Sequence, residues 1–185
     1  MYVWINYILS NHREAKDMIK LMILGAGILQ TYVIKKAKQL GIYTIAVDVN
    51  PHSIGFQYAD KSYTIDITDQ VSCLDCAKKE GISGILSPAT DYGVLTASHI
   101  SDNLGLPGIP YEVANIIKSK YITRVKTIHL YNSEYLQFFE ISSIEQVLSL
   151  NGKLRFPVMI KPVDGSGSKG TGRADDFHTF IKLCE

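Results

Sequence analysis

The 185-residue sequence has almost no net charge and no long apolar run. Its 19 lysine and arginine residues are balanced by 18 aspartate and glutamate residues, which leaves a formal charge of +1. So small an excess gives no field that would attract nucleic acid or an anionic membrane surface. The longest apolar run, "LMILGAGIL", is far shorter than the roughly 18 residues that a membrane-spanning helix needs. We therefore expect neither nucleic acid nor a membrane among its partners.

Cysteine is scarce as well. The three cysteines, Cys73, Cys76 and Cys184, are odd in number, which argues against a disulfide framework and favours a reducing, cytoplasmic location. The pair in "CLDC" has the spacing of metal ligands, but no second pair or nearby histidine completes a set of four. Both cysteines fall on one face of a predicted helix. We interpret them as small core residues and predict no metal site.

The first residues also lack the features of a targeting signal. "MYVWINYIL" is apolar, but it has no basic leader and no small-residue cleavage site, so it is not typical of a signal peptide. Met18 stands directly before "IKLMILGAG", where a compact α/β domain would begin. We therefore assign residues 1–18 to an extension.

Strand-like and helical patterns alternate through the first two thirds of the chain. Such alternation predicts crossover units and a parallel sheet with helices on both faces, which is a Rossmann-like α/β fold. In such a sheet, ligands bind at the carboxyl ends of the strands. The predicted strands cover 19–24, 43–50, 61–67 and 84–88, and the predicted helices cover 28–40, 69–80 and 91–103.

The first predicted helix has a clear apolar stripe, which Gly41 terminates. We expect this stripe to face the core. Its members are Ile28, Leu29, Tyr32, Val33, Ala37 and Leu40.

The pattern changes after "GLPGIP" at 105–110, and we place a domain boundary near residue 118. Further along, "YLQFFEI" and "FPVMIK" are typical of strands. The predicted helices of this part cover 111–118, 119–131, 143–150 and 175–184.

"GAGILQ" is similar to the glycine-rich dinucleotide fingerprint, and Asp48 follows at a distance that suits a ribose-binding acid. Gln30, however, replaces the third glycine. The glycines would let a ligand approach the backbone, and the helix that follows would attract an anion. A tight strand-to-helix turn without a ligand is the alternative.

A second glycine-rich stretch, "KPVDGSGSKGTG", follows an apolar strand. It is not a Walker A loop, because Thr171 stands where that motif needs lysine. Exposed N–H groups, hydroxyls and Lys169 would suit a loop that folds over phosphates. Lys161, at the end of the strand before it, would hold an anion as a point charge. The alternatives are a surface hairpin without a ligand and a lysine that only reaches water.

From Ile19 to Phe180 the sequence resembles the ATP-grasp enzymes. The resemblance is closest to the carbamoyl-phosphate-synthase-like members, with biotin carboxylase and the purine-pathway ligases more distant. It is carried, in order, by "LMILGAGILQ", "GIYTIAVDVNPHSIGFQYADKSY", "GILSPATD", "LGLPGIPYEVA", "SKYITR" and "FPVMIKPVDGSGSKGTG".

The resemblance implies a pre-ATP-grasp Rossmann-like domain over 19–117 and an incomplete ATP-grasp domain over 118–185. In the first domain it implies acceptor-substrate binding at Gly25, Gly27, Asp48, Thr90 and Asp91. In the second it implies nucleotide binding at Lys120, Lys161, Gly165, Ser166, Gly167, Ser168, Lys169 and Gly170. No catalytic residue is assigned.

The implied reaction is ATP-dependent ligation: a carboxylate becomes an acyl phosphate, and an amine or ammonia then attacks it. ATP and Mg²⁺ are the implied cofactors, although the family's magnesium-binding Glu and Asn lie beyond residue 185. The chain is therefore expected to be inactive alone, with either a second copy or a complementary downstream half as partner. Two alternatives stay open: a non-catalytic small-molecule-binding or assembly module, and part of a nicotinamide-dependent oxidoreductase.

Overall fold

The computed structural model describes residues 18–130, 136–163 and 170–185. The chain divides into two compact units, Met1–Asn115 and Ile116–Glu185. Helix α5 (Tyr111–Lys118) runs from the first unit into the second.

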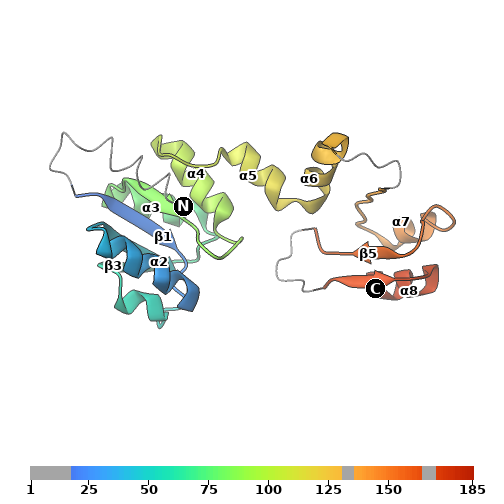
Figure 1. Cartoon of the computed structure of the whole chain (residues 1–185), viewed down its shortest axis with the longest axis horizontal. Helices are drawn as coiled ribbons and strands as arrows, with labels where there is room; N and C mark the ends of the chain where they lie inside the picture. The colour runs from blue at the N-terminus through green and yellow to red at the C-terminus, as the bar shows by residue number, and fades with distance from the viewer. Residues whose placement is uncertain (1–17, 131–135, 164–169) are drawn as a thin grey trace. The chain divides into compact units, whose positions relative to one another are not determined.

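The first unit is built on a four-stranded parallel sheet in the order β3-β2-β1-β4 (Figure 1). Strand β1 lies between two neighbours, with Leu24 opposite Val47 and Met22 opposite Ile85. This sheet confirms the predicted α/β class. The strands are β1 (Lys20–Leu24), β2 (Tyr43–Asp48), β3 (Lys61–Thr64) and β4 (Gly84–Leu86).

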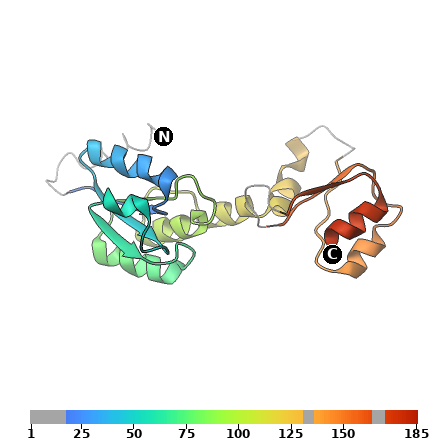
Figure 2. The same ribbon diagram turned by 90° about the horizontal axis from the view of Figure 1, so that it is seen from below.

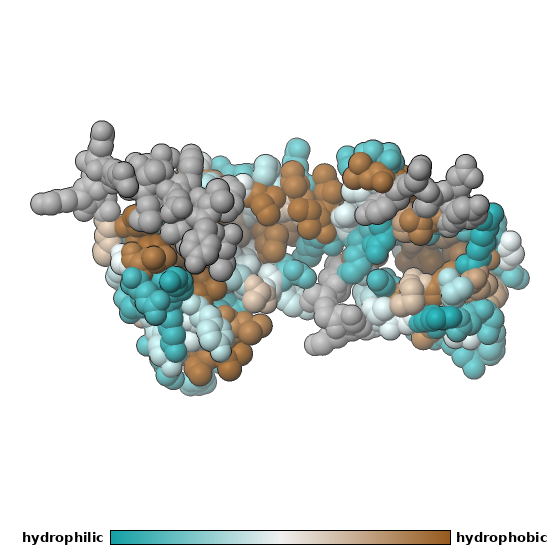
Figure 3. All heavy atoms as spheres, viewed as in Figure 1, coloured by the Kyte–Doolittle hydropathy of each residue, from teal (hydrophilic) through white to brown (hydrophobic). Residues whose placement is uncertain are grey.

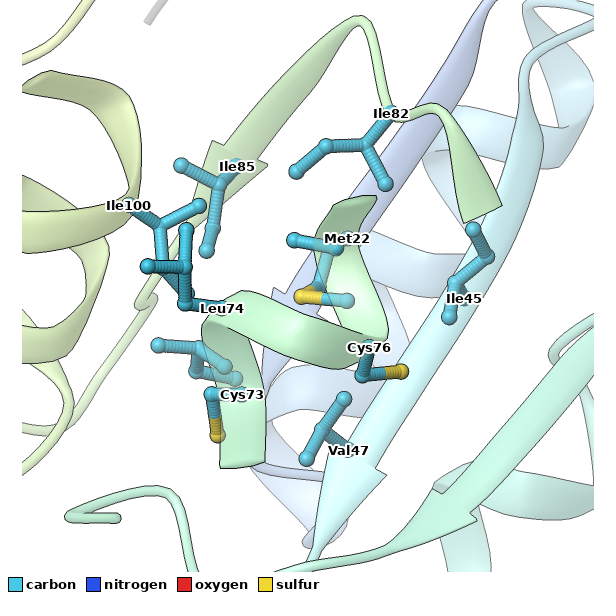
Figure 4. Close-up of a cluster of buried hydrophobic side chains, with 11 residues drawn as sticks. Met22, Ile45, Val47, Cys73, Leu74, Cys76, Ile82, Ile85 and Ile100 are labelled. Atoms are coloured by element: carbon cyan, nitrogen blue, oxygen red, sulfur yellow. The ribbon is translucent and has the colours of Figure 1, made fainter. Parts of the chain in front are cut away.

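Helices cover both faces of this sheet, as Figure 2 shows. Because side chains alternate along a strand, Leu21 and Ile23 face α2 while Met22 and Leu24 face the opposite layer. Figure 4 shows that second layer, in which Met22 meets α3 and α4. The helical elements of the unit are α2 (Ile28–Gln39), η1 (Ile54–Gln57), α3 (Gln70–Glu80) and α4 (Val94–Leu104).

Helix α3 begins and ends where its capping residues predict. The Asp69 carboxylate accepts a hydrogen bond from the Ser72 backbone N–H at 3.1 Å, and Gly81 adopts a left-handed conformation with φ of 60°. Helix α4 begins three residues later than predicted, because residues 87–93 form a loop. In that loop the Ser87 hydroxyl donates to the Thr90 carbonyl at 3.3 Å.

The predicted apolar stripe of α2 is wrong in part, because Ala37 is buried as expected but Ile28, Leu29, Tyr32 and Leu40 are exposed. Ile28 and Tyr32 are 67% and 71% exposed, whereas Ile34 and Ala37 are buried together with the polar Gln30. The turn at Gly25–Gly27 starts the helix in a rotational phase that packs Ile34 and Ala37 against the sheet. Packing against the sheet therefore outweighs the hydrophobicity of the first helical turn.

The interpretation of Cys73 and Cys76 as core residues is confirmed. Both are buried on α3 against the sheet (Figure 4). Burial raises the pKa of Cys73 to about 12 and that of Cys76 to about 11, so both thiols stay protonated at neutral pH. Within the described part of the chain no group of three or more His, Cys, Asp or Glu residues could hold a metal ion.

The second unit packs two helices on a small antiparallel sheet. Val158 lies opposite Ala174, and the core also includes Val147 and Phe180. Its elements are α6 (Lys120–Thr127), η2 (Ile128–Leu130), α7 (Ile144–Ser149), β5 (Val158–Ile160), β6 (Gly172–Ala174) and α8 (Phe177–Cys184). Among the residues described, no helix is long and apolar enough to span a bilayer.

The strand predicted from "YLQFFEI" is also wrong over its described part. Residues 136–141 have no strand structure, although Ile141 packs against the unit's core. The sheet here contains β5 and β6, which pair with each other. A run of β-favouring residues becomes a strand only where a neighbouring backbone supplies its hydrogen bonds.

Apolar side chains remain exposed on α5. Val113 and Ile117, one helical turn apart, are 41% and 56% exposed. Figure 3 shows brown, hydrophobic residues gathered where this helix lies. This exposed stripe extends to Ile109 just before the helix.

A charged cluster at the opposite edge of the sheet from the strands' carboxyl ends joins α3 to β1 and β3. The Glu80 carboxylate accepts hydrogen bonds from Lys61 Nζ at 2.7 Å and from the Tyr63 hydroxyl. The Glu80 carbonyl accepts from Lys20 Nζ at 2.7 Å. The bonds from Lys61 and Tyr63 hold the pKa of Glu80 below its usual value.

We predict that Glu80→Gln flattens the acid limb of the stability profile. Because the folded pKa is depressed, the Glu80 carboxylate contributes stability that is present above its unfolded pKa near 4.5 and is lost as the pH falls through the lower folded value. Urea unfolding between about pH 6 and pH 3 measures the free energy of unfolding in both proteins. The exposed Glu112 supplies the control, Glu112→Gln. Equal slopes of the free energy of unfolding against pH for wild type and Glu80→Gln would contradict this role of the cluster.

Candidate functional site

The carboxyl ends of β1 and β2 meet at a turn that the Asp48 carboxylate organises. Its Oδ2 accepts a hydrogen bond from the Ala26 N–H at 2.7 Å, and its Oδ1 accepts one from the Asn50 N–H at 2.9 Å. The Gly25 N–H donates to the Val47 carbonyl at 2.7 Å. The structure therefore brings Gly25, Gly27 and Asp48 together at one edge of the sheet.

Close backbone packing from η1 supports the same turn. The Gly55 N–H donates to the Ala26 carbonyl at 2.7 Å, and a Cβ at Gly55 would stand only 2.6 Å from that oxygen. Gly25 has φ of 91°, a conformation that glycine adopts at little cost. The turn is thus held by the Asp48 carboxylate at the end of β2 and by the backbone of η1.

Thr90 and Asp91 follow β4 at the same edge, but they bond within their own loop. The Thr90 hydroxyl accepts from the Tyr92 N–H at 3.3 Å, and the Asp91 carbonyl accepts from the Val94 N–H at 3.4 Å. Ala89 in this loop has φ of 56°, which is unusual for a residue other than glycine. Neither side chain makes the link to the β1 turn.

Gln30 makes that link, and it was missed as a site residue. Its Nε2 donates to the Pro88 carbonyl at 2.7 Å, which joins the loop after β4 to the turn after β1. The side chain is only 7% exposed and lies against Gly25 and Gly27. Gln30 precedes Ile34 by one helical turn and Ala37 by two, so it falls on the face of α2 that packs against the sheet. That position was the signal in the sequence.

Gln30 also changes what the fingerprint can bind. A Cβ at Gly25 would meet the Gln30 Cδ at 3.3 Å, so the side chain occupies the space beside the turn. In the dinucleotide fold, glycine at this third position permits close packing of helix and strand around a bound pyrophosphate. The turn therefore departs from a dinucleotide site in its geometry as well as in its sequence.

We predict that Asp48→Ala loosens this turn. The two hydrogen bonds that the Asp48 carboxylate accepts, each worth about 1.5–3 kcal/mol, are lost together. The Ala26 amide should exchange with solvent at least tenfold faster, which NMR-detected hydrogen exchange measures. The exposed α3 residue Asp75 supplies the control variant Asp75→Ala. Unchanged protection of Ala26 in Asp48→Ala would show that Asp48 does not hold the turn.

The second unit contains a cavity of about 840 Å³ at the end of β5. Lys120, Lys161 and Gly170 lie on its wall, so the structure brings these three predicted residues to one cavity. The Lys120 N–H donates to the Val163 carbonyl at 3.4 Å, which joins the start of α6 to the segment after β5. Gly165, Ser166, Gly167, Ser168 and Lys169 lie outside the described residues.

A third cation, Arg124, lines the same cavity and was not predicted. Its guanidinium donates to the Lys120 carbonyl at 2.8 Å and lies over the Phe138 ring at 5.7 Å. The signal was its place one turn after Lys120 in "SKYITR". Arg155 lines the cavity too, so four cationic side chains outnumber one carboxylate, Glu140, and this excess favours an anionic ligand.

Comparisons with known proteins bear on both units. No family model matches the chain. It is 34% identical over 176 residues to the formate-dependent phosphoribosylglycinamide formyltransferase of Sulfurovum sp. (strain NBC37-1), a match that covers 92% of this chain and 44% of that protein. The crystal structure of phosphoribosylglycinamide synthetase from Anaerococcus prevotii superposes with a TM-score of 0.66 at 27% identity, covering 90% of this chain and 41% of that one.

A structure with a bound nucleotide has the same fold. The N5-carboxyaminoimidazole synthetase from Staphylococcus aureus complexed with ADP superposes with a TM-score of 0.67 at 13% identity, covering 92% of this chain and 45% of that one. This chain thus spans less than half the length of the relatives it matches.

Proposed function

We propose, from its homology to the amino-terminal portion of the ATP-grasp carboxylate–amine ligases, that the chain supplies the acceptor domain and the first part of the nucleotide site of such a ligase. The observation that carries this proposal is the meeting of Lys120, Arg124 and Lys161 at one cavity. The family recognised from the sequence is confirmed. The particular likeness to carbamoyl-phosphate-synthase-like members stays a prediction.

In the proposed reaction the second unit holds ATP. ATP-grasp ligases use ATP, and one solved relative carries ADP. Lys161 follows β5 directly, so a rigid strand positions its ammonium as a point charge toward phosphate oxygens. Lys120 and Arg124 add positive charge from α6, where they would stabilise the negative charge of the transferring phosphoryl group. We propose that Gly165–Gly170 form the lid over these phosphates.

We propose that Mg²⁺ is held by acidic residues in the portion of the full-length relatives that this chain does not cover. The described residues of this chain supply cations to the cavity, and they contain no cluster of three metal-ligating side chains. The metal would supply further neutralisation of phosphate charge. The contribution of this chain would be to bind and orient the phosphates through its lysines.

The first unit is proposed to bind the acceptor substrate at the carboxyl edge of its sheet. The turn at Gly25–Gly27 presents the uncapped amino end of α2 there, beside Gln30, and Asp48 fixes the turn. Thr90 and Asp91 stand on the neighbouring loop. The substrates we propose are a small carboxylate and an amine or ammonia, joined through an acyl phosphate. The chain partner would be a second copy or a complementary half.

We predict that Lys161→Ala removes ligase activity when the chain is joined to the remaining portion of the Sulfurovum sp. relative. Loss of a charge that stabilises phosphoryl transfer should lower ATP-dependent ligation at least a hundredfold, by about 2.7 kcal/mol or more. Coupled detection of ADP release measures it. Lys182, which is exposed and does not line the cavity, provides the control Lys182→Ala. Activity that survives Lys161→Ala would contradict the role assigned to Lys161.

We predict no ATP-dependent ligation by the 185-residue polypeptide by itself, with any acid and amine pair. The physical reason is that the proposed metal-binding acids are not supplied to the cavity. The same ADP-release assay tests this, with the joined protein as the positive control. Magnesium-dependent turnover by the 185-residue polypeptide that disappears in Lys161→Ala would show that the chain holds a complete site.

A further inference from the structure

Helix α6 begins at Lys120, so the position of this lysine depends on how the start of the helix is held. A single residue, Ser119, separates the end of α5 at Lys118 from the start of α6. The first residues of a helix lack the full set of intrahelical hydrogen bonds, and they fray unless other groups hold them. A loose junction between the two helices would therefore spread the Lys120 ammonium over many positions.

The Thr123 hydroxyl bridges this junction. Its Oγ1 donates to the carbonyl of Ile116, in the last turn of α5, at 2.7 Å. The last carbonyls of a helix have no partner within that helix, so the bond satisfies a group that the end of α5 would otherwise leave to water. Both residues belong to the second unit. Thr123 therefore ties the first turn of α6 to the last turn of α5.

Other contacts at the start of α6 hold it less firmly against its surroundings. The Ser119 hydroxyl accepts from the Ile122 N–H at 3.2 Å, but this cap lies within the helix and leaves its direction free. The Lys120 N–H reaches the Val163 carbonyl at 3.4 Å, which is long for a hydrogen bond. Among these contacts, the bond from Thr123 is the short one that joins α6 to another element.

We propose that Thr123 is a positioning residue for the nucleotide: its bond to the Ile116 carbonyl fixes the start of α6 and thereby holds Lys120 at the cavity. Thr123 does not line the cavity of about 840 Å³ that Lys120 lines, so its effect on a ligand there passes through Lys120. The inference rests on the proposed function, in which Lys120 belongs to the nucleotide site. It deepens that function by assigning a residue that sets the geometry of the site without contacting the ligand.

Titration of the 185-residue chain with ATP, followed by NMR at the amides of β5, measures the affinity that this role affects. Thr123→Val keeps the shape of the side chain but removes the donor, so it should weaken ATP binding about fivefold, or by about 1 kcal/mol. Thr123→Ala also lacks the hydroxyl and favours the helix, and it should match Thr123→Val. Thr123→Ser keeps a hydroxyl and should bind within about twofold of wild type.

Two controls separate positioning from a general loss of structure. Thr127 donates to the Thr123 carbonyl at 2.8 Å within α6, so Thr127→Val removes a threonine hydroxyl without touching the junction and should bind ATP as wild type does. If Thr123 acts through Lys120, adding Thr123→Val to Lys120→Ala should change the affinity by less than about twofold, because the positioned charge is already gone.

Four results would overturn the role of Thr123 alone. They are wild-type affinity in Thr123→Val, no recovery in Thr123→Ser, an equal loss in Thr127→Val, and a further fivefold loss, of about 1 kcal/mol, when Thr123→Val is added to Lys120→Ala. Absence of ATP binding by the wild type, or wild-type affinity in Lys120→Ala, would overturn the proposed nucleotide site and this inference with it. The two failures are therefore distinguishable.

Discussion

Burial of β1 on all sides is the constraint on which the first unit depends. The strand pairs with β2 along one edge and β4 along the other, and both of its faces are covered by helices. Because all three strands are parallel, the turn after β1 must emerge between the ends of its neighbours. That placement lets Asp48 bond the turn from one side and Gln30 bond the loop after β4 from the other. The candidate acceptor site is a direct result of this topology.

The second unit brings cationic side chains together around its cavity. Ser119 caps α6 by accepting from the Ile122 N–H at 3.2 Å, which fixes the helix that carries Lys120 and Arg124. β5 brings Lys161 to the same cavity. A ligase that activates a carboxylate through ATP needs both an anion site and an acceptor site. Each unit, taken by itself, has the chemistry for one of them.

Sequence patterns predicted this fold where local signals and packing agree. Asp69 and Gly81 mark the ends of α3 because capping is decided by neighbouring residues. Part of the stripe on α2 failed because its rotational phase depends on contacts with the sheet, and residues 136–141 failed as a strand because pairing depends on a distant partner. Lys161 was proposed from its place before a glycine-rich loop, whereas Lys120 was proposed through the family resemblance alone. Gln30 was missed because a glutamine acquires a role only when folding brings Pro88 to it.

Photolabelling with an azido analogue of ATP, followed by peptide mass spectrometry, tests most directly the central claim that the nucleotide belongs to the second unit. The account predicts label on peptides from 136–163, which line the cavity that holds Lys161. Excess unlabelled ADP should compete it away. Label concentrated on the peptide that contains Gly25, Gly27 and Gln30 would instead place the nucleotide at the first unit's sheet edge and contradict the account.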